Sequence, residues 1–293
     1  MSFSQAQLDA YLTHINFPPL LHPSDPLSRL RLLQAHHLAR IPFESLSLHY
    51  SPHRLLTLDI PSLFSKIITH SRGGYCMELN ALFASLLRSL GYTLFSSGGR
   101  VWEQDHWTGL SHMINIVTIN NTRYLVDVGF GSGGSMQPIP LIHGTEFPQI
   151  PPARGKLEHT ALPEHADHSQ RVWLYSTQAE ENAPWERRMM FLDVEFFPAD
   201  YAVMNLSPMT QPQSFFVQNV LASQVLLDEE KRPSGVVSML GGTVRRKGGG
   251  EDVVLVECKT EEERVEALEK YFDIVLSEAE RNGIKGLPSE LKG

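Results

Sequence analysis

The chain has 293 residues, of which 42% are hydrophobic and 20% are charged, with a net charge of −8. This length allows one large domain or two to three small ones, and the composition is typical of a folded globular protein. The negative charge argues against nucleic-acid binding. The basic cluster at residues 245–247 has only three residues beside three glycines, and we predict an exposed turn there.

Cysteine usage and hydropathy limit the class of protein further. Only Cys76 and Cys258 occur, so a disulfide framework is excluded, and no CxxC or paired His/Cys spacing predicts a metal site. No apolar run approaches the roughly 18 residues of a membrane span, and no basic segment followed by an apolar one opens the chain. We therefore expect no metal, no membrane or nucleic-acid partner, and a cytoplasmic location.

The first 91 residues carry helix signals. Three predicted helix starts have a polar N-cap residue followed by a capping-box glutamine or a proline: Ser4 with Gln7, Asp25 with Pro26, and Asp59 with Pro61. Prolines 18 and 19 are expected to end the first of these helices, and Pro42 the second. We predict a helical subdomain.

A further predicted helix begins near Cys76, in the stretch R-G-G-Y-C-M-E-L-N at residues 72–80. Apolar residues recur at spacings of three and four up to Gly91, which suits a left-handed residue after a helix end. Cys76 is then in or just before the first turn, where free N–H groups and the helix dipole favour a thiolate. Gly73-Gly74 suits a tight turn with close backbone approach. Alternatively, Cys76 is a small buried hydrophobe, as free cysteines usually are.

After Gly91 the hydrophobic period changes from about 3.6 to two. The predicted strands of the middle third are 92–97, 100–102, 112–119, 122–128, 172–175 and 189–194. Residues 151–170 are rich in proline and histidine without periodicity, and we predict a surface insertion there. These strands fit a β-barrel or a strongly bent antiparallel sheet.

The last third mixes strand and helix patterns. Residues 215–227 and 253–258 are strand-like. Thr260 with Glu263 predicts the start of a final helix, which Asn282-Gly283 would end.

The hairpin at residues 112–128 brings two chemically active side chains together. Asn120-Asn121 suits a two-residue type I′ turn, because asparagine tolerates positive φ. In that register His112 faces Gly129, and Asp127 is its diagonal neighbour on the same sheet face, at a Cβ separation of about 7 Å. A carboxylate within an apolar strand is costly unless it is paired, and His112 is the predicted partner.

Cysteine at a helix start, followed by histidine and aspartate on one sheet face, is the order needed for nucleophilic catalysis. The imidazole of His112 would take the thiol proton of Cys76, and Asp127 would orient the imidazole. The alternative is a structural His–Asp pair in a barrel wall.

A glycine-rich segment at residues 129–134 formally contains G-x-G-x-x-G after a strand. A dinucleotide-binding turn must open a helix, but Pro138 and Pro140 follow within a few residues, so we reject a Rossmann turn. Such a loop could still let backbone N–H groups approach an anionic or acyl ligand.

The stretch around Cys76 closely resembles the RGGxCxELN signature of the arylamine N-acetyltransferases, and looser similarity extends over nearly the whole chain. The other resembling segments are 41–44, similar to the family's IPFEN with Ser45 in place of asparagine, Thr108-Gly109 before the histidine, 127–131, similar to DVGFG, 210–215, and 258–272. The resemblance implies an α+β fold. It would comprise an N-terminal helical bundle at residues 1–93, a central antiparallel β-barrel at 94–205 and a C-terminal α/β lid at 206–293. The Cys-His-Asp site would lie between the first two.

The resemblance also implies a ping-pong reaction of xenobiotic metabolism. Cys76 would take an acyl group from acyl-CoA, most commonly acetyl-CoA, and pass it to the nitrogen of an arylamine or arylhydrazine. His112 would act as base and Asp127 as orienter. By position, the candidates for CoA binding are Thr108, Gly109, Ser214 and Phe215, and those for the arylamine pocket are Phe43 and Phe130. Core packing of the two phenylalanines, and a turn role for Ser214, are the alternatives.

Two other functions remain open at this point. The order Cys-His-Asp also serves cysteine hydrolases of the papain or transglutaminase type. A catalytically silent relative that binds aromatic ligands is the other. Cys258 as the reactive thiol is disfavoured, because it follows Glu257 in a predicted strand. Residues 151–170 and 283–293 can shape the CoA cleft, and relatives that prefer propionyl or malonyl groups leave the donor open.

Overall fold

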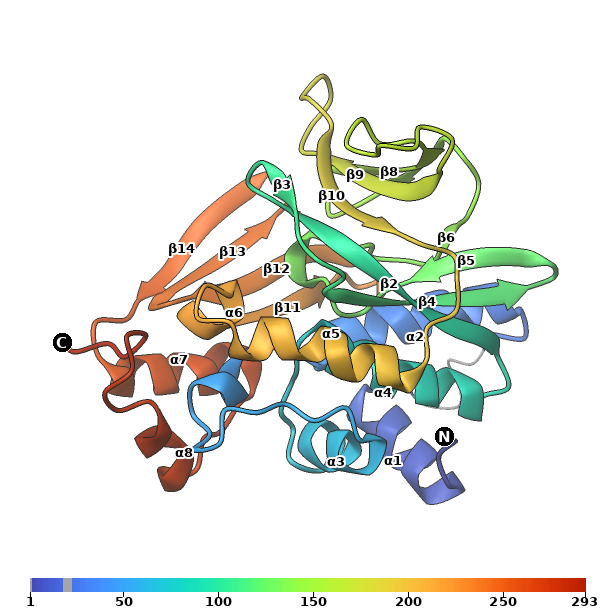
Figure 1. Cartoon of the computed structure of the whole chain (residues 1–293). Coiled ribbons are helices and arrows are strands. Elements are labelled where there is room, and N and C mark those ends of the chain that lie inside the picture. Colours follow the sequence, from blue (N-terminus) through green and yellow to red (C-terminus); the bar gives the residue numbers. More distant parts are fainter. Residues whose placement is uncertain (1, 18–22) are drawn as a thin grey trace.

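The computed structural model describes residues 2–17 and 23–293, and it is an α+β protein (Figure 1). Helices and strands alternate in groups along the chain. The α-helices are α1 (Gln5–His14), α2 (Pro26–Arg40), α3 (Ile60–Phe64), α4 (Cys76–Ser89), α5 (Pro198–Thr210), α6 (Phe215–Gln218), α7 (Glu261–Phe272) and α8 (Glu278–Gly283). Short helical turns are η2 (Leu46–Leu48), η3 (Ser65–Thr69) and η4 (Gly131–Gly133), of which η3 is π-helical.

The N-terminal helices begin where their capping residues predict. The Ser4 hydroxyl accepts from the Gln7 N–H at 3.3 Å, and the Gln7 side chain accepts from the Ser4 N–H at 3.0 Å. Asp25 and Asp59 accept from the N–H groups three residues later, at 2.7 and 3.0 Å. These predicted caps are confirmed, whereas prolines 18 and 19 lie outside the described residues.

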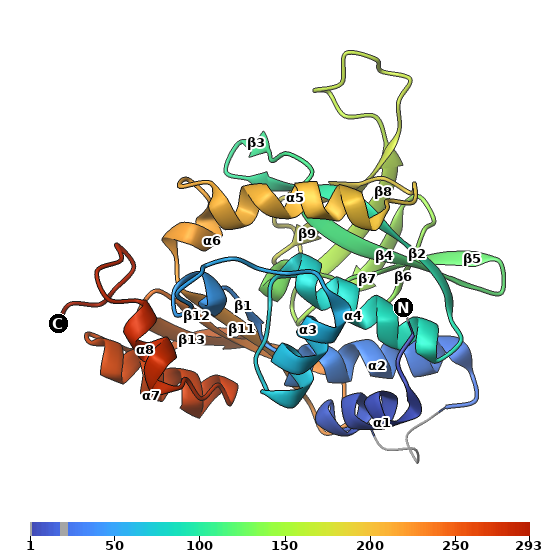
Figure 2. The ribbon, with the colours of Figure 1, turned by 60° about the horizontal axis from the view of Figure 1, so that its bottom comes forward.

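Helix α4 is almost entirely buried and organises the N-terminal core. It begins at Cys76 and is followed by Gly91 at φ +83°, the left-handed residue that the sequence predicts. Its apolar side chains pack against α1, α2 and the strand faces above them. Figure 2 shows α1 to α4 gathered below the strands of the larger sheet.

The larger sheet has nine strands and is antiparallel. Its strands are β2 (Thr93–Glu103), β3 (His106–Trp107), β4 (His112–Ile119), β5 (Thr122–Val126), β6 (Ile139–Pro140), β7 (Thr145–Pro148), β8 (Arg154–Thr160), β9 (Val172–Gln178) and β10 (Glu186–Phe191). The order β6-β5-β4-β2-β10-β9-β8-β7 brings the two edge strands near each other, so the sheet curls into a nearly closed barrel. The predicted α+β class with an antiparallel barrel is confirmed.

Two expectations for this sheet were wrong. The predicted strands 92–97 and 100–102 form one continuous strand, β2, whose pairing with β4 runs through Gly98 and Gly99. These glycines do not break the strand: they lie where the Phe196 ring and the Met190 carbonyl leave no room for a side chain. The segment 151–170 is not wholly irregular, since it contains β8, which is paired along its whole length with β9. Partner strands decide such pairing, and a short segment does not reveal them.

The smaller sheet has the order β1-β11-β12-β13-β14. Its strands are β1 (Phe43–Glu44), β11 (Leu221–Leu227), β12 (Pro233–Leu240), β13 (Thr243–Gly248) and β14 (Glu251–Glu257), and α7 packs against it. Strand β1 comes from the N-terminal third and pairs with β11. The division of the chain at residues 93 and 205 stays a prediction.

The C-terminal third also corrects three expectations. Residues 215–218 are the short helix α6 instead of strand, and the basic cluster 245–247 lies within β13 instead of a turn. The final helical region is broken, because α7 ends at Phe272 with Asp273 in the left-handed conformation and α8 begins after Ser277. The chain turns at Asp273, and this turn places the following apolar residues, Ile274 and Leu276, in the core.

Candidate active site

Cys76 is the first residue of α4 and is only 3% exposed. The preceding turn runs beside β1: the Gly74 carbonyl accepts from the Glu44 N–H at 2.9 Å, and the Gly74 N–H donates to the Pro42 carbonyl at 3.3 Å. A Cβ at Gly74 would lie 2.9 Å from the Cβ of Glu78, so a side chain has no room there. The glycine therefore allows the close backbone approach that fixes the start of α4.

His112 and Asp127 meet at the end of the β4–β5 hairpin. Asn120 and Asn121 have φ of +49° and +62°, and residues 119 and 122 are paired, as predicted. Nε2 of His112 lies 2.7 Å from Oδ2 of Asp127, and both side chains are buried. The hairpin register thus brings together the two residues that the sequence predicted as neighbours.

The second oxygen of Asp127 binds two neutral donors. Oδ1 accepts from Nδ2 of Asn80 at 2.8 Å and from the N–H of Gly129 at 2.8 Å. Asn80 lies one turn after Cys76 on α4, so the same helix carries the thiol and a support for the carboxylate. A Cβ at Gly129 would lie 2.6 Å from the Cα of Cys76, which shows how closely the two segments approach.

The electrostatics favour a protonated imidazole. Burial by itself lowers the pKa of His112, but the Asp127 carboxylate and hydrogen bonding to Cys76 outweigh it and raise the pKa to about 10. Since Nε2 binds Asp127, the remaining ring nitrogen, Nδ1, is the one available to Cys76. The Cys76 Sγ also lies 3.5 Å from the carbonyl oxygen of Ser111. Thiol, imidazole and carboxylate therefore form one connected group.

Aromatic side chains surround this group. The ring of Phe130 lies edge-on to the imidazole of His112, with centroids 5.1 Å apart and planes at 83°. Phe43 packs edge-on to Phe216 at 6.0 Å and borders Gly131 in the glycine-rich loop. Phe130 thus contacts His112, and Phe43 packs against the apolar cluster that contains Cys76.

The predicted CoA residues fall into two groups. The hydroxyl of Thr108 lies 2.9 Å from that of Ser111, whose carbonyl contacts Cys76, and a Cβ at Gly109 would meet open space. Ser214 caps α6, accepting from the Phe216 N–H at 3.3 Å and donating to the Pro208 carbonyl at 2.6 Å. The side chain of Phe215 is 46% exposed. Ser214 thus caps α6 in this structure, and its contact with CoA stays a prediction.

Sequence reasoning missed several neighbours of Cys76. Tyr201 and Met204 of α5 and Phe216 of α6 pack in its apolar cluster, but neither helix was predicted. Asn80 could have been found, because it lies at i+4 from Cys76 and so on the same helix face. Among the described residues, no group of three or more His, Cys, Asp or Glu could hold a metal ion. Within the same residues, no helix combines the length and apolarity of a membrane span.

Comparison with known proteins assigns the chain to a family. A family model described as N-acetyltransferase matches residues 26–281. N-malonyltransferase FDB2 of Fusarium pseudograminearum (strain CS3096) is 36% identical, with 96% of this chain and 92% of the relative covered. The arylamine N-acetyltransferase of Salmonella typhimurium superimposes with a TM-score of 0.82 at 25% identity, covering 96% of this chain and 98% of that one. The Mycobacterium marinum arylamine N-acetyltransferase in complex with CoA gives 0.77 at 27% identity, covering 94% and 97%. The chain therefore belongs to the arylamine N-acetyltransferase family of acyltransferases.

Proposed function

We propose that this protein transfers a short acyl group from acyl-CoA to the nitrogen of an arylamine or arylhydrazine, through a thioester on Cys76. The observation that carries the proposal is the buried His112–Asp127 pair at the start of α4, where Cys76 lies. The CoA complex of a Mycobacterium marinum relative supports CoA as the carrier of the acyl group.

The first half-reaction forms the acyl-enzyme. The Cys76 thiolate attacks the thioester carbonyl of acyl-CoA, a new S–C bond forms, and the C–S bond to CoA breaks. The departing CoA thiolate takes the proton of the His112 imidazolium, which leaves the imidazole neutral. The raised pKa of His112 favours an imidazolium in the resting enzyme, so a cation lies beside the Cys76 sulfur.

The second half-reaction consumes the acyl-enzyme. The amine nitrogen attacks the Cys76 thioester, and the neutral imidazole of His112 accepts the proton that the amine loses. The C–S bond breaks, the amide leaves, and the thiolate–imidazolium pair is restored. Asp127 keeps the ring oriented through Nε2, and Asn80 and the Gly129 N–H hold Asp127 in place.

The donor is proposed to be acetyl- or malonyl-CoA. Acetyl transfer is named for the structural relatives, whereas FDB2, with 36% identity, is named a malonyltransferase. The cytoplasmic location and a role in xenobiotic metabolism stay predictions.

Intact mass spectrometry tests the proposal directly. The protein is incubated separately with acetyl-, propionyl- and malonyl-CoA without an amine, and an arylamine is then added. We expect one acyl adduct from the preferred donor, located on Cys76 by peptide mapping and lost when the amine is added. Cys76→Ser should give no adduct, and Cys258→Ser, at the other cysteine, should behave as the unchanged protein.

The alternatives give different results. A folded protein that takes an acyl group from none of the three donors would favour a silent binder of aromatic ligands. An adduct that is released to water at the same rate with and without amine would favour a hydrolase.

A further inference from the structure

The start of α4 is also held on the helix face opposite Cys76, because residue 78 lies about 200° around the helix axis from residue 76. Glu78, in the first turn of α4, is a buried carboxylate, with a side chain only 2% exposed. Its Oε2 accepts from the Tyr75 N–H at 3.1 Å, and Tyr75 is the residue directly before Cys76. This bond satisfies one of the N–H groups that a helix start leaves free. The position of Glu78 thus bears directly on the backbone that carries the thiol.

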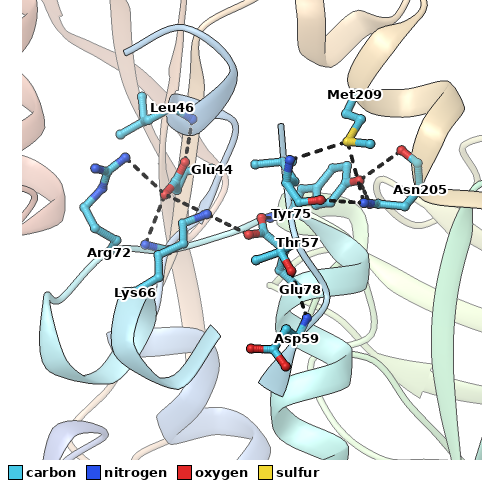
Figure 3. Close-up of polar contacts among 12 residues, drawn as sticks. Glu44, Leu46, Thr57, Asp59, Lys66, Arg72, Tyr75, Glu78, Asn205 and Met209 are labelled. Atoms are coloured by element: carbon cyan, nitrogen blue, oxygen red, sulfur yellow. Dashed lines mark hydrogen bonds and ion pairs between the residues drawn. The ribbon is translucent and has the colours of Figure 1, made fainter. Parts of the chain in front are cut away.

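The other oxygen of Glu78 binds Lys66. Nζ of Lys66 donates to Oε1 at 2.8 Å, and the same Nζ lies 4.0 Å from Oε1 of the buried Glu44 (Figure 3). Lys66 therefore lies between two buried carboxylates. It reaches this position from η3, the π-helical turn at Ser65–Thr69, in which the His70 N–H bonds to the Ser65 carbonyl at 3.0 Å. Single π-turns are rare and frequently occur at functional sites.

Among the charged groups around Glu78, Lys66 is the one that most strongly stabilises the charged carboxylate. Burial raises the pKa of Glu78, and Glu44 adds to this increase, whereas Lys66 opposes it. The second cation, Arg72, is engaged with Glu44 and with Glu280 of α8. Facing Cys76 itself are His112 with Asp127, and Tyr75 next to it. Lys66 is therefore the cation bonded directly to Glu78.

We propose that Lys66 is a positioning residue for acyl transfer: by binding Glu78 it fixes the start of α4 and neutralises a carboxylate that would otherwise disfavour the Cys76 thiolate. Without Lys66, a charged Glu78 would repel the thiolate. A protonated Glu78 would be a weaker acceptor for the Tyr75 N–H. Both outcomes disfavour the reactive form. The inference rests on the proposed role of Cys76 as nucleophile.

The test measures the rate of Cys76 alkylation by iodoacetamide against pH, with peptide mapping to exclude Cys258, together with kcat and KM for the preferred donor. In Lys66→Met we expect the alkylation midpoint to rise by about one pH unit, with the rate at pH 6 and kcat both reduced about tenfold. KM for the donor should change less than twofold. Lys66→Arg should stay within about threefold of the unchanged protein in both rates.

The double variant separates charge from packing. In Lys66→Met/Glu78→Gln the amide oxygen can still accept from the Tyr75 N–H, but neither charge remains. We expect its alkylation midpoint to return to within about 0.3 pH units of the unchanged protein. If Lys66→Met fails to fold, Lys66→Gln carries the test, because its amide can still donate to Glu78 but has no charge. A role of Lys66 in stability alone predicts an unshifted midpoint in this variant, whereas the proposed role predicts a rise.

Lys156→Met is the matched control. Lys156 forms an ion pair with Glu158 at 3.0 Å and has a similarly covered side chain, 21% exposed against 20% for Lys66. Its partner is 30% exposed, and Lys156 lies in β8 of the barrel. Its loss should leave the alkylation profile unchanged.

Two results would overturn the inference: an unshifted midpoint in folded Lys66→Met, or a double variant as impaired as the single one. Failure of the proposed function is distinguishable. In that case the unchanged protein itself would show slow alkylation of Cys76 with no reactive thiolate below the ordinary thiol range.

Discussion

Two buried charge clusters flank Cys76, and they differ in the kind of cation they contain. On one side the carboxylate of Asp127 binds His112, and on the other Glu44 is within ion-pair distance of Arg72 and Lys66. Both carboxylates are about 1% exposed, and both accept backbone N–H groups: Asp127 from Gly129, and Glu44 from Gly73 and Leu46. An imidazole can give up a proton to a reacting group and take it back, whereas lysine and arginine side chains ordinarily stay protonated. We infer that equal burial serves proton transfer in the first cluster and positioning in the second.

His112→Gln is expected to have the largest effect. Glutamine cannot hold the Cys76 proton or return it to a leaving group, so kcat/KM should fall by about 10²- to 10⁴-fold. Steady-state transfer from the preferred acyl-CoA measures the loss, and circular dichroism checks the fold. Turnover within tenfold of the unchanged protein would show that His112 does not transfer the proton. The two clusters would then not differ in function.

Asp127→Asn should impair both activity and stability. An amide nitrogen facing Nε2 of His112 can donate only to a neutral ring, so the imidazolium would lose its partner, and a buried charge pair would be broken. We expect kcat/KM to fall at least tenfold and the free energy of unfolding to fall by about 3 kcal/mol. Urea denaturation and steady-state kinetics measure the two. Full activity in this variant would show that the carboxylate does not orient the ring.

Glu44→Gln is the counterpart in the second cluster. Removing this carboxylate leaves Arg72 without its buried partner, so we expect a comparable loss of about 3 kcal/mol in the free energy of unfolding. Because the hydrogen bonds and ion pairs of Glu44 are with Leu46, Gly73, Lys66 and Arg72, and not with Cys76, His112 or Asp127, kcat/KM of the folded fraction should stay within about tenfold. A drop as large as that of His112→Gln, without loss of stability, would contradict a structural role.

The pH dependence of stability should report the proton that His112 holds in the first cluster. The pKa of His112 is raised to about 10 in the folded protein, against about 6.5 in an unfolded chain. Folded His112 therefore binds an extra proton between these values. Its stabilisation is complete below pH 6.5 and is lost as the pH rises through about 10, with a slope of at most about 1.4 kcal/mol per pH unit. Urea unfolding of the unchanged protein and of His112→Gln from pH 6 to 10 measures the difference. Parallel curves would mean that His112 has an ordinary pKa.

Glu280→Ala should have the smallest effect. Glu280 binds Arg72 from α8 and accepts from the Ser277 N–H at 2.8 Å, but its side chain is one-third exposed. Loss of this partly solvated pair and cap should cost about 1 kcal/mol of unfolding free energy. Activity should stay within about twofold. A large activity loss would mean that α8 helps to position the helix that carries Cys76. Glu280 would then belong to the second cluster as a positioning residue.

Local signals were sufficient for several parts of the molecule. The caps at Ser4, Asp25 and Asp59, the helix from Cys76 to Gly91, and the hairpin around Asn120-Asn121 were all predicted correctly. Each depends on hydrogen bonds or dihedral preferences within a few residues, which the sequence contains directly. The His112–Asp127 contact follows from the hairpin register, and so it was also predictable.

Tertiary pairing decided the rest. Strand β1 has two residues and exists because β11 pairs with it, and residues 245–247 became strand because β12 and β14 flank them. Lys66 reaches Glu78 only because a π-turn and the close approach of Gly74 to β1 bring these segments together. By itself the sequence determined the His112–Asp127 contact, the local elements around Cys76 and the family. The tertiary structure decided how the His112–Asp127 pair and the Lys66–Glu78 pair hold the start of α4. These pairs depend on contacts between segments far apart in the chain, and local sequence patterns do not contain the energies of such contacts.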